Sequence, residues 1–565
     1  MALALPAASL PALAENHQAG RTDLPAKLLS RKLPFRKRGA TVITVKLPND
    51  GVSDCSKAIN DAINSLPEDG GTVWLPYQKT GGSKDCIYRI NTTANTYTSP
   101  KRPNHGQPYG IKLRSNMLLQ LEPGVQLKAM PTNVARAYVI FATDVHDIEI
   151  ANGAIIGDRH EHTNSGKGTG EWGHGMQLLG VSRATVRSIY ISDCEGDGIC
   201  VGRGPSSRTN DLIICDVIST RNRRQALSIT NGDNISVFDS EFSYTHGTAP
   251  QDGIDIEPDG TGQVNNVIID NCILPGNEAS GIEVNASHGS SIRNLTITNC
   301  VIRDNVYSGF FTVQKGTAVL DNGVLYEWCH GIQIIGAQHV TVRACIISDC
   351  TGDGICVGRY NGVDPSDIII CDVVCTGNRR QALSLTGGDT LQVYDSEFSN
   401  TYGTAPQNGI DIEPMGGANL SNITIDNCLI RGNSGDGIEL NANGTATSVT
   451  NLTVQNCLIA GNYWHGIAVH GSGAIDTGGI YGNAFYQNGN IGLSLADSPT
   501  NYTIGALNKD GNFTNNFANN NVGTYSYPNN TSSDVNGYVA GDDMHLGPDV
   551  LGSSSNVVRY NRFFT

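Results

Sequence analysis

The stretch Asp252-Gly253-Ile254-Asp255-Ile256 carries a pattern that recurs along the chain: a polar residue, a small residue, and then alternating apolar and polar side chains. Successive repeats are 22 to 29 residues apart, and self-similarity of this length is typical of a solenoid in which each repeat forms one coil. The pattern begins at His174, Asp197, Gln225, Asp252, Ser280 and Ser308, then again at His330, Asp353, Gln381, Asn408, Asp436, His465 and, more weakly, Ile491.

A second family of strands lies between these repeats. Residues 294–300 and 422–428 alternate apolar and polar side chains and are rich in β-branched residues, as β-strands are. Each coil therefore holds at least two short strands, and none of the repeats has helical periodicity. Leucine-rich repeats have similar lengths, but their Leu/Asn consensus is absent. We predict an all-β fold: a single-stranded right-handed parallel β-helix, a solenoid whose stacked coils bury the alternate apolar residues.

The solenoid contains an internal tandem duplication. Residues 171–313 match residues 327–470 at an offset of 156, and in the longest shared block, residues 247–258 against 403–414, only Asp252 is replaced, by Asn408. Six coils are therefore expected to be duplicated. Because a solenoid grows by adding coils, we expect residues 113–500 to form one continuous helix that contains both copies.

The two ends of the chain differ from the coils. Residues 41–112 are expected to cap the first coil, with an amphipathic helix over residues 56–66 and a strand over residues 70–76. Residues 1–40 read as a signal remnant and solvated basic linker, because Ala12-Leu13-Ala14 is similar to the end of a secretory signal. Residues 501–565 predict irregular final coils or a tail. We therefore expect a secreted or periplasmic protein.

Charge and hydropathy exclude two classes of partner. The formal net charge of -15 disfavours nucleic acid, whose phosphates would be repelled, and no apolar run is long enough to cross a bilayer. A polysaccharide or oligosaccharide is the expected partner.

The 15 cysteines are expected to be mostly structural. Several recur at the same place in successive coils, as small buried side chains do. Cys55 and Cys86 flank the predicted cap and are the expected disulfide. Since no CxxC pair occurs, we predict no metal cluster and no required cofactor, with Ca²⁺ as the one option.

Asp255 of the quoted stretch and Glu257 just after it are expected to face outward together. Strand alternation points Ile254 and Ile256 inward, so that Asp255 and Glu257 share the outer face. The equivalent outward position is Ser228 one coil back and Glu283 one coil on, and parallel strands lie roughly 4.8 Å apart. Carboxylates this close perturb each other's pKa values, which acid/base catalysis exploits.

Further polar residues are expected beside this acidic strip. Arg223 and Arg224 come from the preceding coil and His246 from the turn before the strand; arginine can hold anionic or hydroxyl-rich ligands, and histidine can move protons. The catalytic candidates are Asp197, Asp252, Asp255, Glu257 and Glu283. The substrate-binding candidates are Arg223, Arg224, Gln225 and His246 in the first copy and Arg379, Arg380, Asp411, Glu413 and Glu439 in the second.

The same strand resembles a known family. Residues 252–256 are similar to the Asn-Thr-Asp-Gly-Ile-Asp strand of family 28 glycoside hydrolases, the polygalacturonases, within the pectate-lyase-like superfamily, and residues 196–201 resemble their Gly-Asp-Asp-x-Ile-Ala strand. The resemblance covers most of residues 41–470 and implies the fold. The order of the two motifs is reversed here, Gly173-His174-Gly175 lies upstream, and no Arg-Ile-Lys motif occurs, so the polygalacturonase active site is not implied.

Three functions fit these observations. A glycoside hydrolase would use two carboxylates as acid and base, and Asp197 and Asp252, two coils apart, would lie roughly 9 to 10 Å from each other. A polysaccharide lyase or uronate C5-epimerase would need a base and a cation to neutralise the sugar carboxylate. A glycan-binding adhesin or phage-type fibre would need no catalytic pair. We rank the hydrolase first, the lyase or epimerase second and the binding protein third.

Overall fold

The computed structural model divides into Met1–Phe35 and a compact unit, Arg36–Thr565, and the fold is that of the second unit. The structure describes residues 33–48, 50–78, 85–100, 102–163, 171–287, 289–306, 311–314, 317–320, 329–442, 447–471, 474–495, 500–504, 515–518, 520, 544–546, 557–558 and 562–564. The predicted signal remnant therefore lies outside the described residues. None of the described helices is long and apolar enough to cross a membrane.

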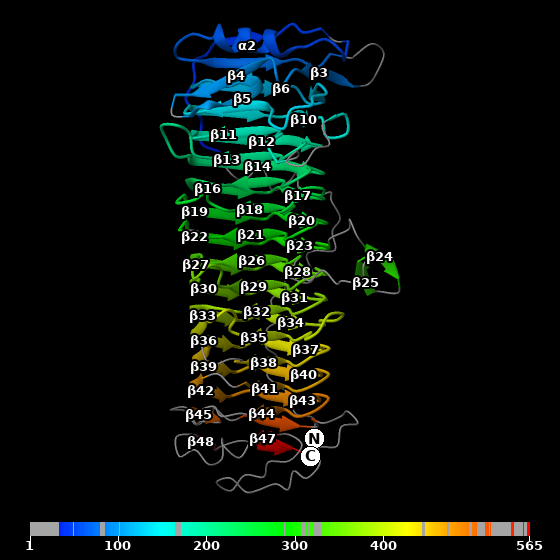
Figure 1. The fold of residues 1–565 in the computed structure, drawn as a ribbon, viewed down its shortest axis with the longest axis vertical. Helices are drawn as coiled ribbons and strands as arrows, with labels where there is room; N and C mark the ends of the chain where they lie inside the picture. Colours follow the sequence, from blue (N-terminus) through cyan, green and yellow to red (C-terminus); the bar gives the residue numbers. More distant parts are fainter. Residues whose placement is uncertain are drawn as a thin grey trace. The chain divides into compact units, whose positions relative to one another are not determined.

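The described strands form a right-handed parallel β-helix, as predicted. One sheet, called here the front sheet, takes one strand from each coil, and its strands are stacked in chain order (Figure 1). All its pairings are parallel except that of β4 with β5. Its strands are β4 (Asn95–Ser99), β5 (Arg102–Lys112), β8 (Tyr138–Thr143), β11 (Met176–Leu179), β13 (Ile199–Gly202), β15 (Leu227–Ile229), β18 (Ile254–Ile256), β21 (Ile282–Asn285), β26 (Ile332–Ile335), β29 (Ile355–Gly358), β32 (Leu383–Leu385), β35 (Ile410–Ile412), β38 (Ile438–Asn441), β41 (Ile467–His470), β44 (Leu493–Leu495) and β47 (Met544–Leu546).

The remaining strands of the coils form a second, larger sheet. Most coils contribute two strands to it, one on each side of a corner of the coil. They are β1 (Val42–Thr44), β2 (Gly71–Leu75), β3 (Cys86–Ile90), β6 (Met117–Leu121), β7 (Val125–Ala129), β9 (His146–Ala151), β10 (Ala154–Ile156), β12 (Ser182–Ser192), β14 (Asn210–Thr220), β16 (Gly232–Phe238), β17 (Glu241–Ser243), β19 (Gln263–Asp270), β20 (Ile273–Pro275), β22 (Ser291–Thr298), β23 (Val301–Arg303), β27 (Gln338–Arg343), β28 (Ile346–Ser348), β30 (Ser366–Cys371), β31 (Val374–Thr376), β33 (Gly388–Tyr394), β34 (Glu397–Ser399), β36 (Asn419–Asp426), β37 (Leu429–Arg431), β39 (Ser448–Gln455), β40 (Leu458–Ala460), β42 (Ala474–Tyr481), β43 (Ala484–Tyr486), β45 (Thr500–Ile504), β46 (Asn516–Ala518), β48 (Val557–Val558) and β49 (Arg562–Phe564).

The apolar core runs through both copies without a break. Ile254 and Ile256 point inward and are fully buried, and so are their counterparts Ile410 and Ile412. The last rung of the first copy, β21, pairs directly with the first rung of the second, β26. The described coils of both copies thus share one sheet and one core.

One expected rung is absent from the first copy. The repeat at Ser308 predicted a strand between β21 and β26, but these two strands pair with each other, and residues 307–310 themselves lie outside the described residues. The chain that follows forms an antiparallel hairpin instead, β24 (Phe311–Gln314) with β25 (Thr317–Leu320). The prediction of six duplicated coils is therefore wrong by one rung, because strand alternation serves a hairpin as well as a parallel rung.

Buried asparagines hold the corner that precedes the front sheet. The amide of Asn277 donates to the carbonyl of Phe242, while its backbone N–H donates to Asn305 in the next coil. The same ladder returns as Asn433 and Asn462 in the second copy. These side chains satisfy backbone groups that would otherwise be buried without partners, and so set the height of each coil.

The N-terminal cap contains the predicted helix, α2 (Ser56–Asn64), and strand β2. The predicted disulfide is absent: Cys55 and Cys86 are both free and buried. Cys55 lies near the carbonyl of Ser53, and Cys86 accepts the N–H of Gln78, so each thiol sulfur contacts backbone atoms of its own segment.

The basic stretch before the cap was predicted to be a solvated linker, and this prediction is wrong for Arg36 and Arg38. Arg36 is only 2% exposed, and it donates to the Asp211 carboxylate and to Thr185. Arg38 forms an ion pair with Glu149. These arginines fasten the chain to β9, β12 and β14 by charge-assisted hydrogen bonds.

Candidate functional site

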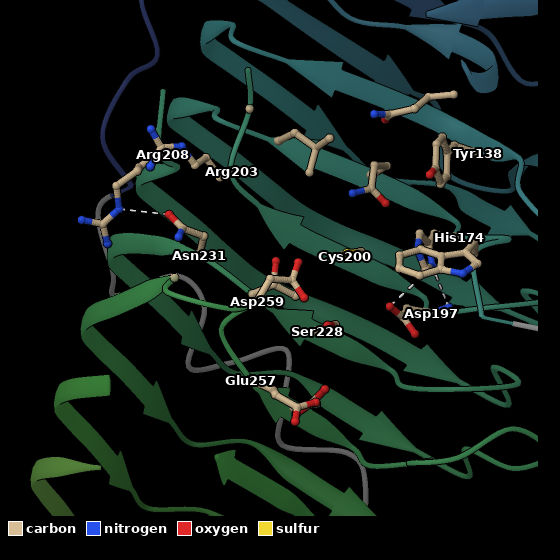
Figure 2. A pocket seen from close by; sticks show the side chains of 18 of the residues that line it. Tyr138, His174, Asp197, Cys200, Arg203, Arg208, Ser228, Asn231, Glu257 and Asp259 are labelled. Atoms are coloured by element: carbon tan, nitrogen blue, oxygen red, sulfur yellow. Dashed lines mark hydrogen bonds and ion pairs between the residues drawn. The ribbon is translucent and has the colours of Figure 1, made fainter. Parts of the chain in front are cut away.

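A groove with a volume of about 690 Å³ lies over the front sheet of the first copy. Figure 2 shows His174 with Asp197 at one end, Arg203 and Arg208 at the other, and Glu257 and Asp259 beside the strands. Its lining includes, from the predicted set, Asp197, Arg224, Asp255 and Glu257, and beyond that set Ser99, Gln107, Arg136, Tyr138, Trp172, His174, Gln177, Leu179, Cys200, Arg203, Gly204, Pro205, Arg208, Ser228, Thr230, Asn231, Asp259, Thr261, Gly262 and Gln263.

The acidic strip has the predicted register. Asp255 pairs with Ser228 on one side and with Glu283 on the other. Asp255 is not solvated, however, because only 2% of this residue is exposed. One carboxylate oxygen, Oδ2, accepts a hydrogen bond from the Gln225 amide, and the other, Oδ1, has no hydrogen-bond partner among the described residues.

Burial and mutual repulsion keep protons on this strip. Loss of solvation raises the pKa of Asp255 well above its usual value, and the charges of Glu257 and Glu283 raise it further. Burial, followed by the charge of Glu257, raises the pKa of Glu283 to about 7. The pKa of Asp252 is raised in the same way, by burial and then by Glu283. The strip therefore holds carboxylic acids at a pH where isolated ones are ionised.

Asp252 itself lies beneath the strip. It is fully buried, and its Oδ1 accepts the backbone N–H of Ser280 in the next coil. Its Oδ2 has no hydrogen-bond partner among the described residues. This position therefore anchors the turn to the following coil and does not line the groove.

Asp197 organises the other side of the groove. Its Oδ1 lies 3.4 Å from Nη1 of Arg224 and accepts the backbone N–H of Gln225. Burial works against the charge of Arg224, but Asp197 and Asp255 outweigh it and raise the pKa of this guanidinium. Asp197, Arg224, Gln225 and Asp255 thus form one connected polar network across three coils.

His174, Asp197 and Cys200 bring a nitrogen, an oxygen and a sulfur atom within 4.8 Å of one another, and His330, Asp353 and Cys356 repeat the trio. These are metal-ligand residue types. The backbone N–H of Asp197 already donates to Nδ1 of His174, and burial raises the pKa of Cys200, which opposes the thiolate that a metal requires. Burial also lowers the pKa of His174 to about 4. We therefore assign no metal to either trio.

Of the four binding candidates in the first copy, only Arg224 lines the groove, whereas Arg223, Gln225 and His246 do not. Nη1 of Arg223 lies 3.3 Å from the buried carboxylate of Glu195, and its Nε donates to Thr248. His246 is exposed and contacts Arg159. Alternation along a strand could not foresee this, because Arg223 and Arg224 stand in a corner where neighbouring side chains diverge.

Several groove residues were missed by the sequence analysis. Trp172 and Arg136 stack with 4.6 Å between the guanidinium and the ring centroid, and Tyr138 stacks on His174. Arg136 and Tyr138 come from coils before the start of the duplication, where no repeat marks them, whereas the recurrence of Trp172 as Trp328 was an available signal. Arg203 follows β13 and has no ion-pair partner among the described residues; its place at the end of a ladder strand was the available signal.

The second copy keeps the strip but neutralises it differently. Asp411 pairs with Glu439 in the register of Asp255 and Glu283, and Gln381 donates to Asp411. Asn408, which replaces Asp252, donates its amide to Glu439, and His470 lies 2.8 Å from the same carboxylate.

The pKa values of this copy change accordingly. Burial works to raise the pKa of Glu439, but the bonds from His470 and Asn408 hold it below its usual value. The pKa values of Asp411 and Glu413 are raised, first by burial and then by Glu439. Arg380 pairs with Asp353 as Arg224 does with Asp197, and Arg379 is buried in its corner.

A family model described as the right handed beta helix region matches residues 144–325 and, a second time, residues 321–478. The two matches follow the two copies and together span more than half of the chain. The chain belongs to this right-handed β-helix family.

Similarity to individual proteins is more distant. The uncharacterized protein YclG of Bacillus subtilis strain 168 is 32% identical over 256 residues, which are 42% of this chain and 41% of YclG. The pre-mature gene product 12 of bacteriophage phi29 has a TM-score of 0.50 at 13% identity, covering 84% of this chain and 62% of that one. A hyperthermoactive exopolygalacturonase from Thermotoga maritima has a TM-score of 0.41 at 11% identity, covering 77% and 92%. These structural likenesses concern the fold alone.

Proposed function

We propose that this β-helix protein cleaves glycosidic bonds of a polysaccharide or oligosaccharide in the groove of the first copy. The observation that carries the proposal is Asp255, a buried carboxylic acid with a raised pKa whose Oδ1 is left without a partner beside an open groove. A general acid must keep its proton at the working pH and still reach the leaving oxygen.

The roles follow from the surroundings of each carboxyl group. Asp255 is the acid that protonates the glycosidic oxygen. Glu257, which directly follows β18 and is more exposed, is the base that activates water; two extended residues span roughly 6.6 Å. That spacing lies near the lower end of the roughly 6.5 to 9.5 Å between carboxyl groups in inverting glycosidases. Inversion at the anomeric carbon is the expected outcome.

Asp197, Arg224 and Gln225 act in this scheme as positioning residues. Asp197 fixes the backbone of Gln225, and the Gln225 amide holds Oδ2 of Asp255 so that the proton resides on Oδ1. Trp172 and Tyr138 offer apolar ring surface for the face of a sugar. No cofactor is needed for these steps.

A lyase or C5-epimerase is the second candidate, because Arg136, Arg203, Arg208 and Arg224 all line the groove. Arginine is suited to hold the carboxylate of a uronate, which both reactions require. Ca²⁺ on the acidic strip belongs to this alternative. Secretion or a periplasmic location agrees with an extracellular glycan as substrate and stays part of the proposal.

The test is a panel of plant, bacterial and algal polysaccharides incubated with the protein. Reducing ends, ultraviolet absorbance of unsaturated uronates and the anomeric NMR signal of the first product are followed together. New reducing ends with inverted products and no unsaturation support the hydrolase. Unsaturation or C5 inversion supports the second candidate, and binding without any product makes the chain a glycan-binding protein and ends the enzyme proposal.

A further inference from the structure

The residues that follow the C-terminal ends of the front-sheet strands differ between the two copies. In the first copy this edge of the sheet carries Gly204, Arg208 and Asp259, all of which line the groove. At the offset of 156 the second copy has Tyr360, Asp364 and Met415. Two groups are thus replaced by large apolar side chains, and a cation is replaced by an anion.

The new apolar side chains are exposed. Tyr360 follows β29 and is 50% exposed, and Met415 follows β35 and is 52% exposed. Because the two strands are parallel and two rungs apart, both side chains stand on one edge, roughly 9 to 10 Å from each other. The second copy therefore exposes apolar surface on this edge, where the first copy carries Gly204 and Asp259.

Arg359 connects the loop that carries Tyr360 to the loop that carries Met415, and its charge is paired with that of Asp364. Its Nη1 donates to the carbonyl of Gly417 at 3.0 Å, and its Nε lies 3.6 Å from Asp364. The counterpart in the first copy, Arg203, has no ion-pair partner among the described residues. The edge of the second copy is therefore held by its arginine, whereas the edge of the first copy offers its arginine to a ligand.

The first copy has no room for the aromatic ring. A Cβ atom on Gly204 would lie 2.3 Å from the Asp144 carboxylate and 3.0 Å from the carbonyl of Leu179. Asp144 is occupied there, since it accepts the backbone N–H groups of Ser206 and Ser207. The residue in the equivalent place of the second copy is Ala286, which follows β21 as Asp144 follows β8, so the tyrosine is accommodated only there.

We propose that the second copy is a non-catalytic saccharide-binding site in which the Tyr360 ring and Met415 cover the apolar face of a sugar while Ser384, Asp411 and Glu413 bind its hydroxyls. The inference rests on the proposed function, because the sugar is a more distant part of the glycan chain that is cut in the first copy. Sugars present an apolar C–H face and a rim of hydroxyls, and an aromatic ring beside outward carboxylates complements both.

One continuous sheet connects the two sites. Asp255 and Asp411 occupy the same outward register five rungs apart, which is roughly 24 Å at the spacing of parallel strands. A single glycan chain lying along the front sheet reaches both. Long chains therefore gain affinity from the second copy, whereas short ones that fill only the first groove do not.

The experiment exchanges the edge of the second copy for that of the first. The full-length double variant Tyr360→Gly/Met415→Asp is compared with wild type by calorimetry and by kinetics on length series of polygalacturonate, alginate, xylan and cellulose oligosaccharides. Tyr402→His is the matched control, because Tyr402 is a tyrosine of the second copy that is 47% exposed but sits in the corner equivalent to His246. KM and kcat are measured separately on short and long members.

The expected result is an affinity for long chains about 10-fold weaker in the double variant, with kcat and the KM of short chains unchanged and the control equal to wild type. Turnover with the same KM for long chains in both proteins overturns this inference and leaves the proposed function standing. Binding of long chains without turnover, weakened by the double variant, supports the second site and contradicts the proposed cleavage. Absence of both binding and turnover on all four series overturns this inference.

Discussion

The two copies share a core and differ in the pKa values of the outward carboxyl groups on the same sheet. Inward positions of the front sheet are aliphatic or methionine in both, whereas the position before the glycine is Asp252 in one and Asn408 in the other. Asp252 adds an acid to a strip that already repels charge, while Asn408 donates to Glu439 and leaves it ionised. Glu439 is thus paired with His470 and Asn408, whereas its counterpart Glu283 in the first copy has a raised pKa.

The largest expected effect is on catalysis. Asp255→Asn removes the proposed acid and should lower kcat by 10²-fold or more, whereas Asp411→Asn should change it less than about threefold. Both variants are assayed on the glycan that proves active, after circular dichroism has shown that they fold. Equal losses would mean that both copies are catalytic, and a loss confined to Asp411→Asn would reverse the assignment.

The second prediction concerns the shared core. Ile256→Ala and Ile412→Ala each leave a cavity at a fully buried position and should each lower the free energy of unfolding by about 2 to 5 kcal/mol. Denaturant unfolding followed by fluorescence measures the loss. The two values should agree within about 1 kcal/mol; a clear disagreement would show that the copies differ in packing as well as in charge.

The third prediction is a difference in pH dependence. Because the pKa of Glu283 is raised to about 7 in the folded protein, its stabilising contribution is complete below its ordinary pKa of 4.5 and is lost as the pH rises through 7. Asp252→Asn removes one raised carboxyl group and supplies an amide donor, as Asn408 does. The variant should therefore lose about 1 to 3 kcal/mol less stability than wild type between pH 5 and pH 8.

Thermal melting at pH 5 and pH 8 measures this difference. The reciprocal variant Asn408→Asp is the control, and it should become more sensitive to alkaline pH than wild type. Equal melting temperatures for Asp252→Asn and wild type at both pH values would remove the proposed difference in pKa values.

The smallest effect is expected at the thiols. Cys200 and Cys356 occupy the outward register two rungs before Asp255 and Asp411, are 7% and 9% exposed, and have pKa values raised by burial. Both should react slowly and at similar rates with a thiol reagent in the native protein, while all 15 cysteines react after denaturation. Mass spectrometry of labelled peptides gives each rate, and fast labelling of Cys356 alone would show that the second copy is more open.

The fold and the register of the strip could be predicted because both depend on short periods. Alternation places Asp255 opposite Glu283 once the repeats are aligned, and the structure has this pairing. Burial of the strip could not be predicted in the same way. It arises because neighbouring coils and Gln225 close over Asp255, which is a property of the stack and not of one strand.

Corners and insertions limited the rest of the prediction. Arg223 and Arg224 are adjacent in sequence, but one pairs with Glu195 outside the groove and the other with Asp197 inside it. Corner residues depart from the two-residue alternation, so sequence spacing does not indicate their direction. The prediction of a rung at Ser308 was wrong for a related reason. Alternating side chains indicate a strand, but they do not show whether it pairs with the neighbouring coil or with the other strand of a hairpin.

The pairing of β21 with β26 has a consequence for the history of the chain. The first rung of the repeated unit stacks on β8 in one copy and on the end of the other copy in the second, so both neighbours accept the same strand. A further copy of this unit can therefore be inserted in tandem, because its first strand already pairs with the last strand of the copy before it. Duplication of the gene segment would lengthen the protein by one whole unit at a time. Each added copy could then diverge in ligand specificity while the original copy retains its function.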